Sequence, residues 1–248
     1  MSSNTGTIRI GTSGWAYGHW QGAFYPEDLP GERRLPFYAR HFDTVEINNS
    51  FYHLPAEDTL RRWRQAVPDE FVFAVKASRY ITHMKKLKDP ADSTRRFRAR
   101  LDALGDQLGP ILFQLPPTWG FDAGRLAGLL ETLGKGRRYA LEFRDHSWHR
   151  PEALEILADH GAAFCIFDLD GFTSPKEVTA DFTYLRLHGP DGAYEGSYSD
   201  SALAGWAGAL SSWAGQGVDV FCYFDNDDQG HAPRNALRLK EMLDDRAG

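Results

Sequence analysis

The sequence predicts an α/β fold in which eight β-strands and the helices between them form one barrel. Short apolar runs recur eight times along the chain, and helical patterns separate nearly all of them. Alternating strands and helices imply a parallel sheet, and 248 residues is close to the typical length of a (β/α)8 barrel. An open doubly wound sheet usually has G-x-G-x-x-G after its first strand, whereas this chain has G-T-S-G-W-A there. We therefore expect a single TIM-type barrel over residues 5–246.

The expected strands are short and mostly apolar, as strands buried on both faces of a parallel sheet are. Turn residues bound several of them; Pro116 and Pro117, for example, end the fourth strand abruptly. In chain order, the expected strands are 7–11, 44–51, 71–77, 111–116, 139–144, 162–168, 182–189 and 218–224.

The expected helices begin and end at residues that favour helix boundaries. Glu57 and Asp58 place acidic groups in a first turn, Pro151 suits another first turn, and Gly109 with Pro110 ends a third helix. The expected helices are 35–42, 57–66, 90–108, 122–133, 152–160 and 199–214, followed by a terminal helix that begins at the HAPRNA sequence. The connection 169–181 is barely long enough for a parallel crossover, so we expect an atrophied helix there.

The composition is that of an ordinary globular protein, but its charge is unevenly distributed. Apolar residues make up 42% of the chain, charged residues make up 25%, and the net charge is −6. Residues 61–100 contain twelve Lys and Arg but only four acids, so they carry +8 while the remainder carries −14. This basic sector is a candidate surface for nucleic acid or another anion. The alternative is that it forms the solvated faces of two helices, because RRWR and RRFRAR both lie in expected helices.

The chain shows no sequence signal for export or for membrane insertion. The N-terminal MSSNTGT has neither a positive nor an apolar region, and no run approaches the length of a membrane span. Cys165 and Cys222 both fall inside expected strands, where a free thiol behaves as a small hydrophobe. We expect a cytoplasmic protein in a reducing compartment.

Charged and polar residues recur near the ends of the expected strands. In 139–144 the period of two places Glu142 and Arg144 on one face and the apolar residues on the other. If parallel strands share one axis, such residues meet at one mouth, where catalytic groups of these barrels lie. The candidate catalytic residues are Glu46, Lys76, Glu142, Arg144, Asp168, Arg186 and His188, and Asn48 and Gln114 are candidates for substrate binding. The alternatives are a solvated strand face or interior ion pairs that only fill the barrel.

Several stretches together resemble the DUF72 family, which is also called YecE-like. The matching motifs are GTSGWAYGHWQGAFYP, TVEINNSFYHLP, FVFAVKASRYITH, ILFQLPP, YALEFRDHSW, YLRLHG and YFDNDDQGHAPRNA. They run from the first strand to the terminal helix, so the resemblance covers essentially the whole chain. It implies a TIM-barrel-like fold but little chemistry. One departure is Asp225, where the family usually has Asn.

Two loops and the terminal helix carry the remaining binding candidates. Gly189 and the glycines after it can turn backbone amides inward, and the helix that begins near His231 offers an anion site at its N-terminus. We expect a phosphate near Gly189 and His231. Aromatic rings in the expected loops on the mouth side could stack on a base or a sugar, although they could instead pack the loops. The further binding candidates are Trp15, Tyr52, Trp148, Tyr194 and Asn226.

We expect no cofactor and no bound metal. Glu46, Glu142, Asp168, His188 and His53 could ligate a divalent ion, but three cations compete with it for the same space. Neither H-x-H nor H-E-x-x-H spacing occurs. A metal-dependent phosphodiesterase nevertheless stays an alternative. Glycoside hydrolysis is a weaker one, because the cations would oppose an oxocarbenium-like transition state.

The leading hypothesis is an enzyme that acts on an anionic substrate, phosphorylated or nucleic acid, at the mouth of the barrel. His188 is the expected proton-transfer group, and Glu142 or Glu46 is the expected base or its orienting partner. Lys76, Arg144 and Arg186 would stabilise negative charge. The rival hypotheses are a non-catalytic barrel that binds nucleic acid through residues 61–100, and a degenerate barrel kept for protein contacts.

Overall fold

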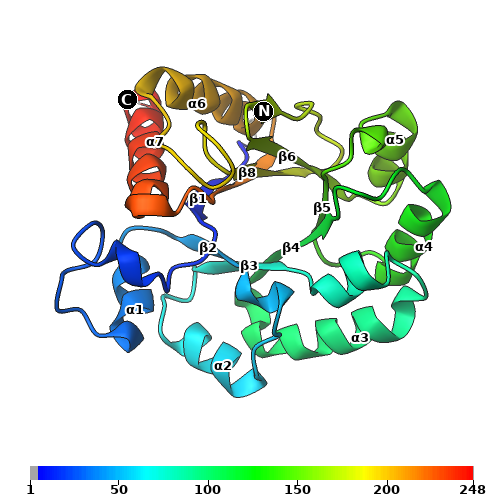
Figure 1. Cartoon of the computed structure of the whole chain (residues 1–248), viewed down its shortest axis with the longest axis horizontal. Helices are drawn as coiled ribbons and strands as arrows, with labels where there is room; N and C mark the ends of the chain where they lie inside the picture. The colour runs from blue at the N-terminus through cyan, green and yellow to red at the C-terminus, as the bar shows by residue number, and fades with distance from the viewer. Residues whose placement is uncertain (1–4, 248) are drawn as a thin grey trace. The chain divides into compact units, whose positions relative to one another are not determined.

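The computed structural model describes residues 5–247 (Figure 1). The first four residues lie outside this range. They belong to the N-terminal stretch MSSNTGT, on which the prediction of no export signal rests. The strands are β1 (Ile8–Thr12), β2 (Thr44–Ile47), β3 (Val72–Lys76), β4 (Leu108–Leu115), β5 (Tyr139–Phe143), β6 (Ala163–Leu169), β7 (Phe172–Thr173), β8 (Phe182–Leu187) and β9 (Asp219–Phe224). The α-helices are α1 (Arg34–Tyr38), α2 (Glu57–Gln65), α3 (Pro90–Leu101), α4 (Ala123–Leu133), α5 (Pro151–Asp159), α6 (Asp200–Gly215) and α7 (His231–Ala247).

Short helical turns occupy several of the loops. They are η1 (Gly18–Trp20), η2 (Gly31–Arg33), η3 (Asn49–Phe51), η4 (Tyr80–Met84), η5 (Asp102–Gln107), η6 (His146–Trp148) and η7 (Asp228–Gly230). All are 3-10 turns except η4, which is a π-helical turn.

The strands form one sheet with the order and direction expected of a (β/α)8 fold. The order is β1-β9-β8-β6-β5-β4-β3-β2, and the pairs β1–β9, β3–β4, β4–β5 and β5–β6 are parallel. A parallel bridge between Ser13 and Glu46 links the end of β1 to β2, so the two ends of this order are also joined. The predicted fold class, a TIM-type α/β barrel, is confirmed.

Three expected elements differ in the structure. The connection 169–181 has no helix among its described residues; β7 instead pairs antiparallel with β6 around Asp170 and Gly171, whose φ angles are +51° and +73°. The helix expected over 90–108 ends at Leu101, because Gly105 has φ 55° and ψ −133° and interrupts it. The strand expected over 44–51 ends at Ile47, because the Ser50 hydroxyl donates to the carbonyl oxygens of residues 47 and 76 within a helical turn.

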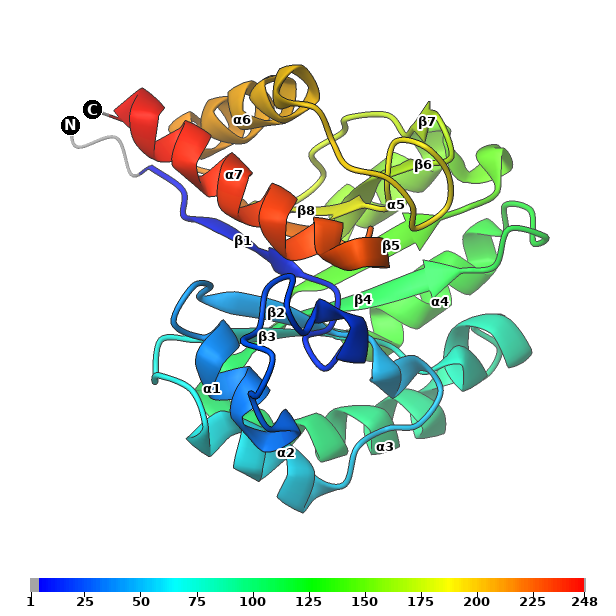
Figure 2. The same cartoon turned by 60° about the vertical axis from the view of Figure 1, so that its left-hand side comes forward.

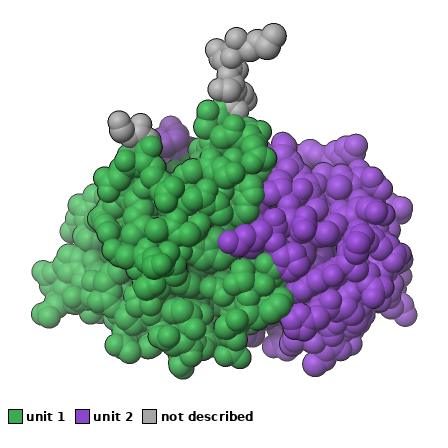
Figure 3. Space-filling model, turned by 90° about the horizontal axis from the view of Figure 1, so that it is seen from above, with its two compact units in different colours: residues 1–46, 167–174, 184–248 green, residues 47–166, 175–183 purple. Residues whose placement is uncertain are grey.

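The chain divides into two compact units (Figure 3). Unit 1 comprises residues 1–46, 167–174 and 184–248, and unit 2 comprises residues 47–166 and 175–183. The prediction of a single domain over residues 5–246 stays a prediction.

In unit 1, two helices cover a pair of parallel strands. Helices α6 and α7 lie side by side and both contact β1 and β9 (Figures 1 and 2). Large rings fill the core beside them, among which Trp20, Tyr38 and Tyr223 are fully buried. This packing fixes the ends of β1 and β9, from which the loops of the unit emerge.

In unit 2, β3, β4 and β5 form the central strands, and successive helices α3, α4 and α5 contact one another. Helix α4 begins where the Asp122 carboxylate accepts a hydrogen bond from the Arg125 amide at 3.0 Å. Its Leu126, Leu129 and Leu130 are buried, as the helical spacing in the sequence predicts.

None of the helices within residues 5–247 combines the length and the apolar character needed to cross a bilayer.

Candidate functional site

In unit 1, the candidate residues stand at or just beyond the carboxyl ends of parallel strands. Glu46 lies near the end of β2 and Arg186 near the end of β8, while His188 and Asp225 follow β8 and β9 directly. Ser13 follows β1 and bridges to Glu46. We call this group, together with Tyr184, the Glu46–Arg186 cluster.

The Glu46 carboxylate is fully buried and accepts several hydrogen bonds. The Tyr184 hydroxyl donates to its Oε2 at 2.7 Å, and Arg186 Nη2 donates to its Oε1 at 2.9 Å. The Ser13 hydroxyl also donates to Oε1. Because the carboxylate, the guanidinium and the phenol are all inaccessible to solvent, each charge depends on the others for stabilisation.

Arg186 joins Glu46 to a second carboxylate and to the histidine. Its Nη2 donates to Asp225 Oδ2 at 2.8 Å, and its Nη1 lies 3.3 Å from His188 Nε2. A guanidinium can only donate, so this contact assigns Nε2 as the acceptor and the imidazole as neutral. The Nδ1 atom lies 3.0 Å from Asp225 Oδ2. His188 is fully buried, and both of its ring nitrogens face charged neighbours.

Two titratable groups beside this cluster show that it carries an excess of negative charge. Burial raises the pKa of Tyr17, and the neighbouring Asp225, Asp227 and Glu46 raise it further, while Arg186 offsets only part of the effect. The pKa of Asp227 is raised as well, first by burial and then by Asp225. The Glu46–Arg186 cluster would therefore bind a positively charged group of a ligand in preference to a negatively charged one.

In unit 2, the candidate residues form a second group, which we call the Lys76–Arg144 cluster. Lys76 ends β3, and its ammonium lies 4.5 Å from the centre of the buried Phe51 ring. Glu142 lies in β5 opposite Gln114 of β4, and its fully buried carboxylate forms an ion pair with Arg144. Only 9% of the Arg144 side chain is exposed.

His83 reports the sign of the charge around this cluster. Its ring lies 4.9 Å from that of Phe51, and its Nδ1 is 2.9 Å from the Thr82 hydroxyl. Burial and then the cations Lys76, Arg79 and Arg144 lower the pKa of His83 from its ordinary 6.5 to about 4. The local potential is therefore positive, and the ring is neutral at pH 7.

The other candidate catalytic residue, Asp168, lies in neither cluster. It belongs to the end of β6 in unit 1, where its carboxylate accepts a hydrogen bond from Thr173 at 3.2 Å. The same carboxylate contributes to raising the pKa of Tyr198, although burial is the larger cause. Asp168 therefore joins the β6–β7 turn to the loop that contains Tyr198.

The aromatic candidates separate into core residues and surface residues. Trp148 is fully buried, stacks on Phe143 at 4.8 Å and donates to the Trp119 carbonyl at 2.7 Å. Trp15 is only 8% exposed. Both residues fit the alternative in which rings pack the loops, because their burial leaves no open face for a ligand. Tyr52 and Tyr194, in contrast, are 65% and 43% exposed.

The Gly189 loop is fastened by its own polar groups. Asn226 is fully buried and donates to the Gly196 carbonyl at 2.8 Å and to Asn235 at 2.9 Å. The Gly189 amide donates to the Tyr198 hydroxyl at 3.0 Å. His231 begins α7 and lies 3.4 Å from Arg234 through its Nδ1. These contacts give Asn226 a structural role, and the phosphate expected near Gly189 and His231 stays a prediction.

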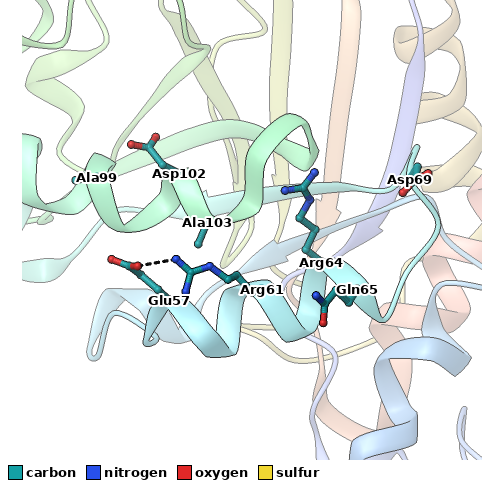
Figure 4. A pocket seen from close by; sticks show the side chains of 8 residues that line it. All are labelled: Glu57, Arg61, Arg64, Gln65, Asp69, Ala99, Asp102 and Ala103. Carbon is teal, nitrogen blue, oxygen red and sulfur yellow. Dashed lines mark hydrogen bonds and ion pairs between the residues drawn. The ribbon is translucent and has the colours of Figure 1, made fainter.

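A groove of about 520 Å³ lies between α2 and the segment formed by α3 and η5 in unit 2 (Figure 4). It is lined by Glu57, Arg61, Arg64, Gln65, Asp69, Ala99, Asp102 and Ala103. Figure 4 shows Arg61 paired with Glu57, at 2.9 Å. The groove therefore mixes acids with arginines and has no uniform charge that would select an anion.

Within residues 5–247, no group of three or more His, Cys, Asp or Glu side chains is placed to hold a metal ion. The half-buried Asn48 follows β2 and adds no ligand to such a group.

Sequence reasoning did not assign Tyr184, Ser13, Asp225 or His83 to the site, although the structure places them in or beside the clusters. Tyr184 could have been found, because it lies two residues before Arg186 and therefore on the same face of β8. Ser13 gives no such signal, since its contact with Glu46 depends on the pairing of distant strands. Asp225 was noted only as a departure from the family pattern, and His83 lies in a segment that was expected to be a loop.

Comparison with known proteins gives consistent matches over most of the chain. Residues 9–248 match the family described as "Protein of unknown function DUF72". The UPF0759 protein YunF of Bacillus subtilis (strain 168) is 27% identical over 96% of this chain and 95% of its own length.

Solved structures show the same similarity. A DUF72 family protein from Thermotoga maritima MSB8 has a TM-score of 0.88 and 28% identity, over 96% of this chain and 99% of that one. A glycoside hydrolase family 5 enzyme from Prevotella bryantii B14 has a TM-score of 0.53 over 97% of this chain and 96% of its own. At 11% identity, the latter shares the fold alone.

Proposed function

Because the chain belongs to the DUF72 family, which is described without a reaction, we propose its function from its own residues: an enzyme that acts on an anionic, phosphorylated substrate by acid–base chemistry. The proposed binding site is the Lys76–Arg144 cluster at the carboxyl ends of β3 and β5. Functional groups of (β/α)8 enzymes lie at this end of their strands.

The observation that carries the proposal is the positive potential at His83. Burial alone would lower the pKa of any histidine, but three cations act on this ring in the same direction. Glu142 is paired with Arg144. A half-buried site with an excess of cations favours an anion over water or a neutral ligand.

The same residues supply groups for proton transfer. Glu142, which pairs with Arg144, carries a carboxyl group of the kind that acts as a general base. His83 is neutral at pH 7 and can therefore accept a proton near the bound anion. We assign this role to His83 in preference to His188, whose Nε2 accepts from Arg186.

His83 also provides the direct test, because its titration can be followed by NMR. Inorganic phosphate bound at the cluster is expected to raise the pKa of His83 above about 4, since an anion stabilises the imidazolium. Lys76→Met is expected to raise this pKa without phosphate and to weaken the phosphate effect. Lys88→Met is the control, because Lys88 is not among the cations that act on His83. A His83 pKa that is insensitive to both phosphate and Lys76→Met would contradict the proposal.

Stability should follow the same titration. The pKa of His83 is lower in the folded protein than in the unfolded chain, so only the unfolded chain binds this proton between about pH 6.5 and 4. The free energy of unfolding should therefore fall as the pH falls through this window, by about 1 kcal/mol once solvent screening of the half-exposed ring is considered. Phosphate should reduce the loss.

Catalysis itself is tested by a screen of phosphomonoesters, phosphodiesters and nucleotides. Glu142→Gln is expected to abolish any activity that the screen finds while retaining the effect of phosphate on His83. Activity that survives Glu142→Gln unchanged would show that this carboxylate is not the base.

A further inference from the structure

The loops that follow β2 and β3 present an exposed surface in which aromatic rings and cations are adjacent. Tyr52, Tyr80 and Met84 are 65%, 48% and 66% exposed, and all three belong to unit 2. Burying such side chains would be favourable, so their exposure in one region indicates a binding surface. We call Tyr52, Arg79, Tyr80, Met84 and Lys85 the aromatic–basic surface.

The cations of this surface contact its rings and no carboxylates. The Arg79 guanidinium lies 5.7 Å from the centre of the Tyr52 ring, and the Lys85 ammonium lies 5.8 Å from that of Tyr80. Among the described residues, neither Arg79 nor Lys85 forms an ion pair. Their charges are therefore available to an anionic partner.

The helical arginines of the same basic sector behave differently. Arg61 pairs with Glu57 and Asp58 at 2.9 Å, and Arg96 pairs with Asp92 at 2.9 Å. Arg95 also forms an ion pair with Asp92. Three of the seven arginines of α2 and α3 thus pair with acids of their own helix, whereas Arg79 and Lys85 pair with no carboxylate among the described residues.

The backbone holds this segment in place before any partner binds. Leu87 is only 1% exposed, and its amide donates to the Ile81 carbonyl at 3.0 Å. Arg125 of α4 donates to the carbonyl of Lys86 at 2.8 Å. A surface fixed in this way loses little conformational entropy on binding.

Ring contacts connect the exposed surface to the Lys76–Arg144 cluster. Phe51 lies 5.0 Å from Tyr52 on one side and 4.9 Å from His83 on another, and the Lys76 ammonium lies over its ring. A ligand that extends from the cluster along these rings would reach the aromatic–basic surface without leaving the unit.

We propose that the aromatic–basic surface binds single-stranded nucleic acid, with bases stacked on Tyr52 and Tyr80 and phosphates placed beside Arg79 and Lys85. Alternating rings and cations are the arrangement that single strands require, since every base has a face that can stack and every linkage carries a charge. A duplex fits poorly, because its bases are already stacked on one another. The inference rests on the proposed function, because it names single-stranded nucleic acid as the class of substrate that the Lys76–Arg144 cluster would act on.

Fluorescence anisotropy with labelled single-stranded DNA and RNA oligonucleotides tests the proposal. The whole chain should bind them, with affinity that falls steeply as salt is raised, and an unlabelled duplex should compete poorly. Combined Tyr52→Ala and Tyr80→Ala should weaken binding by about tenfold or more. The matched control combines Arg95→Ala and Arg96→Ala on α3, which should change the affinity less than about twofold because both guanidinium groups pair with Asp92 instead of lying over Tyr52 or Tyr80.

Any of four outcomes would overturn the inference. The first is no binding of single strands, and the second is equal binding of duplex. The third is that the α3 control loses binding while the tyrosine variant keeps it, which would show that the nucleic acid binds to the helices instead. Phosphatidylserine vesicles that bind as tightly, and with the same dependence on the tyrosines, would identify a lipid surface and also overturn it.

The two proposals fail separately. Oligonucleotide binding without any effect of phosphate on His83 would remove the proposed function and leave this surface intact. A phosphate effect on His83 without oligonucleotide binding would remove only this inference. Circular dichroism of each variant verifies the fold, which these exposed side chains should not affect.

Discussion

Arg186 pairs with two buried carboxylates. Its guanidinium contacts Glu46 through Nε and Nη2, and Asp225 through Nη2. An Asn at position 225, which the resemblance to DUF72 proteins implies, would accept the same hydrogen bond without carrying a charge. The Asp in this chain therefore makes one guanidinium compensate two carboxylates.

Arg186→Met should destabilise the protein by about 3–5 kcal/mol, because it leaves two buried carboxylates without their cation. Urea denaturation at neutral pH measures the change. Arg238→Met is the matched control, since Arg238 pairs with Asp200 and Glu241 on the exposed surface and its loss should destabilise the protein far less. Adding Asp225→Asn should recover part of the loss only in the Arg186→Met background. Equal destabilisation by the two arginine variants would contradict this account of the cluster.

At the scale of single residues, the sequence predicts which side chains share a face of a strand, but it does not predict the sign of the electrostatic potential around them. Period two indicates that Glu142 and Arg144 share a face, and the structure pairs them. The negative character around Tyr17 and the positive character around His83 were not predictable, because each arises from residues on separate strands and loops. The sequence alone suggested one mixed group of charges; the structure forms one cluster within each unit.

At the scale of elements, the segment between β3 and α3 differs most from its prediction. It was expected to be a loop, but it contains the π-helical turn η4 followed by Lys86, Leu87 and Asp89 with φ of +46°, +61° and +45°. Non-glycine residues rarely adopt this conformation, and no glycine in the segment signals it. Buried Leu87 and the hydrogen bond from Arg125 hold the conformation. Such strain often accompanies binding loops.

Replacing Lys86 by Gly should maintain or raise the free energy of unfolding, because Gly adopts positive φ without steric cost. Lys88→Gly removes the same charge two residues later, where φ is not positive, and should lower the free energy of unfolding. The two variants should differ by about 1 kcal/mol in thermal or urea denaturation. If Lys86→Gly proves the less stable of the two, the positive φ is not a source of strain.

At the scale of the whole molecule, the order of elements was predictable and the closing contacts were not. Eight apolar runs separated by helices predict the parallel order, because the alternation of strand and helix leaves few other topologies. The link between β1 and β2 depends on close contacts between individual atoms. Gly11 lies against the Thr44 carbonyl, and the Tyr38 hydroxyl accepts a hydrogen bond from the Thr12 amide at 2.8 Å. No pattern in either strand indicates how closely they approach.

Gly11→Ala tests how far the fold depends on that approach. A Cβ at position 11 would lie 2.3 Å from the Thr44 carbonyl oxygen and 3.0 Å from the Tyr38 hydroxyl, so the backbone of β1 or β2 must move. The expected loss is about 2 kcal/mol or more, with a lower Tm and faster hydrogen exchange at the amides of β1. Gly18→Ala is the control, because its Cβ would meet nothing within 4 Å, and its stability should change by less than about 0.5 kcal/mol. Equal Tm values for the two variants would show that the packing of β1 on β2 contributes little to the stability of the fold.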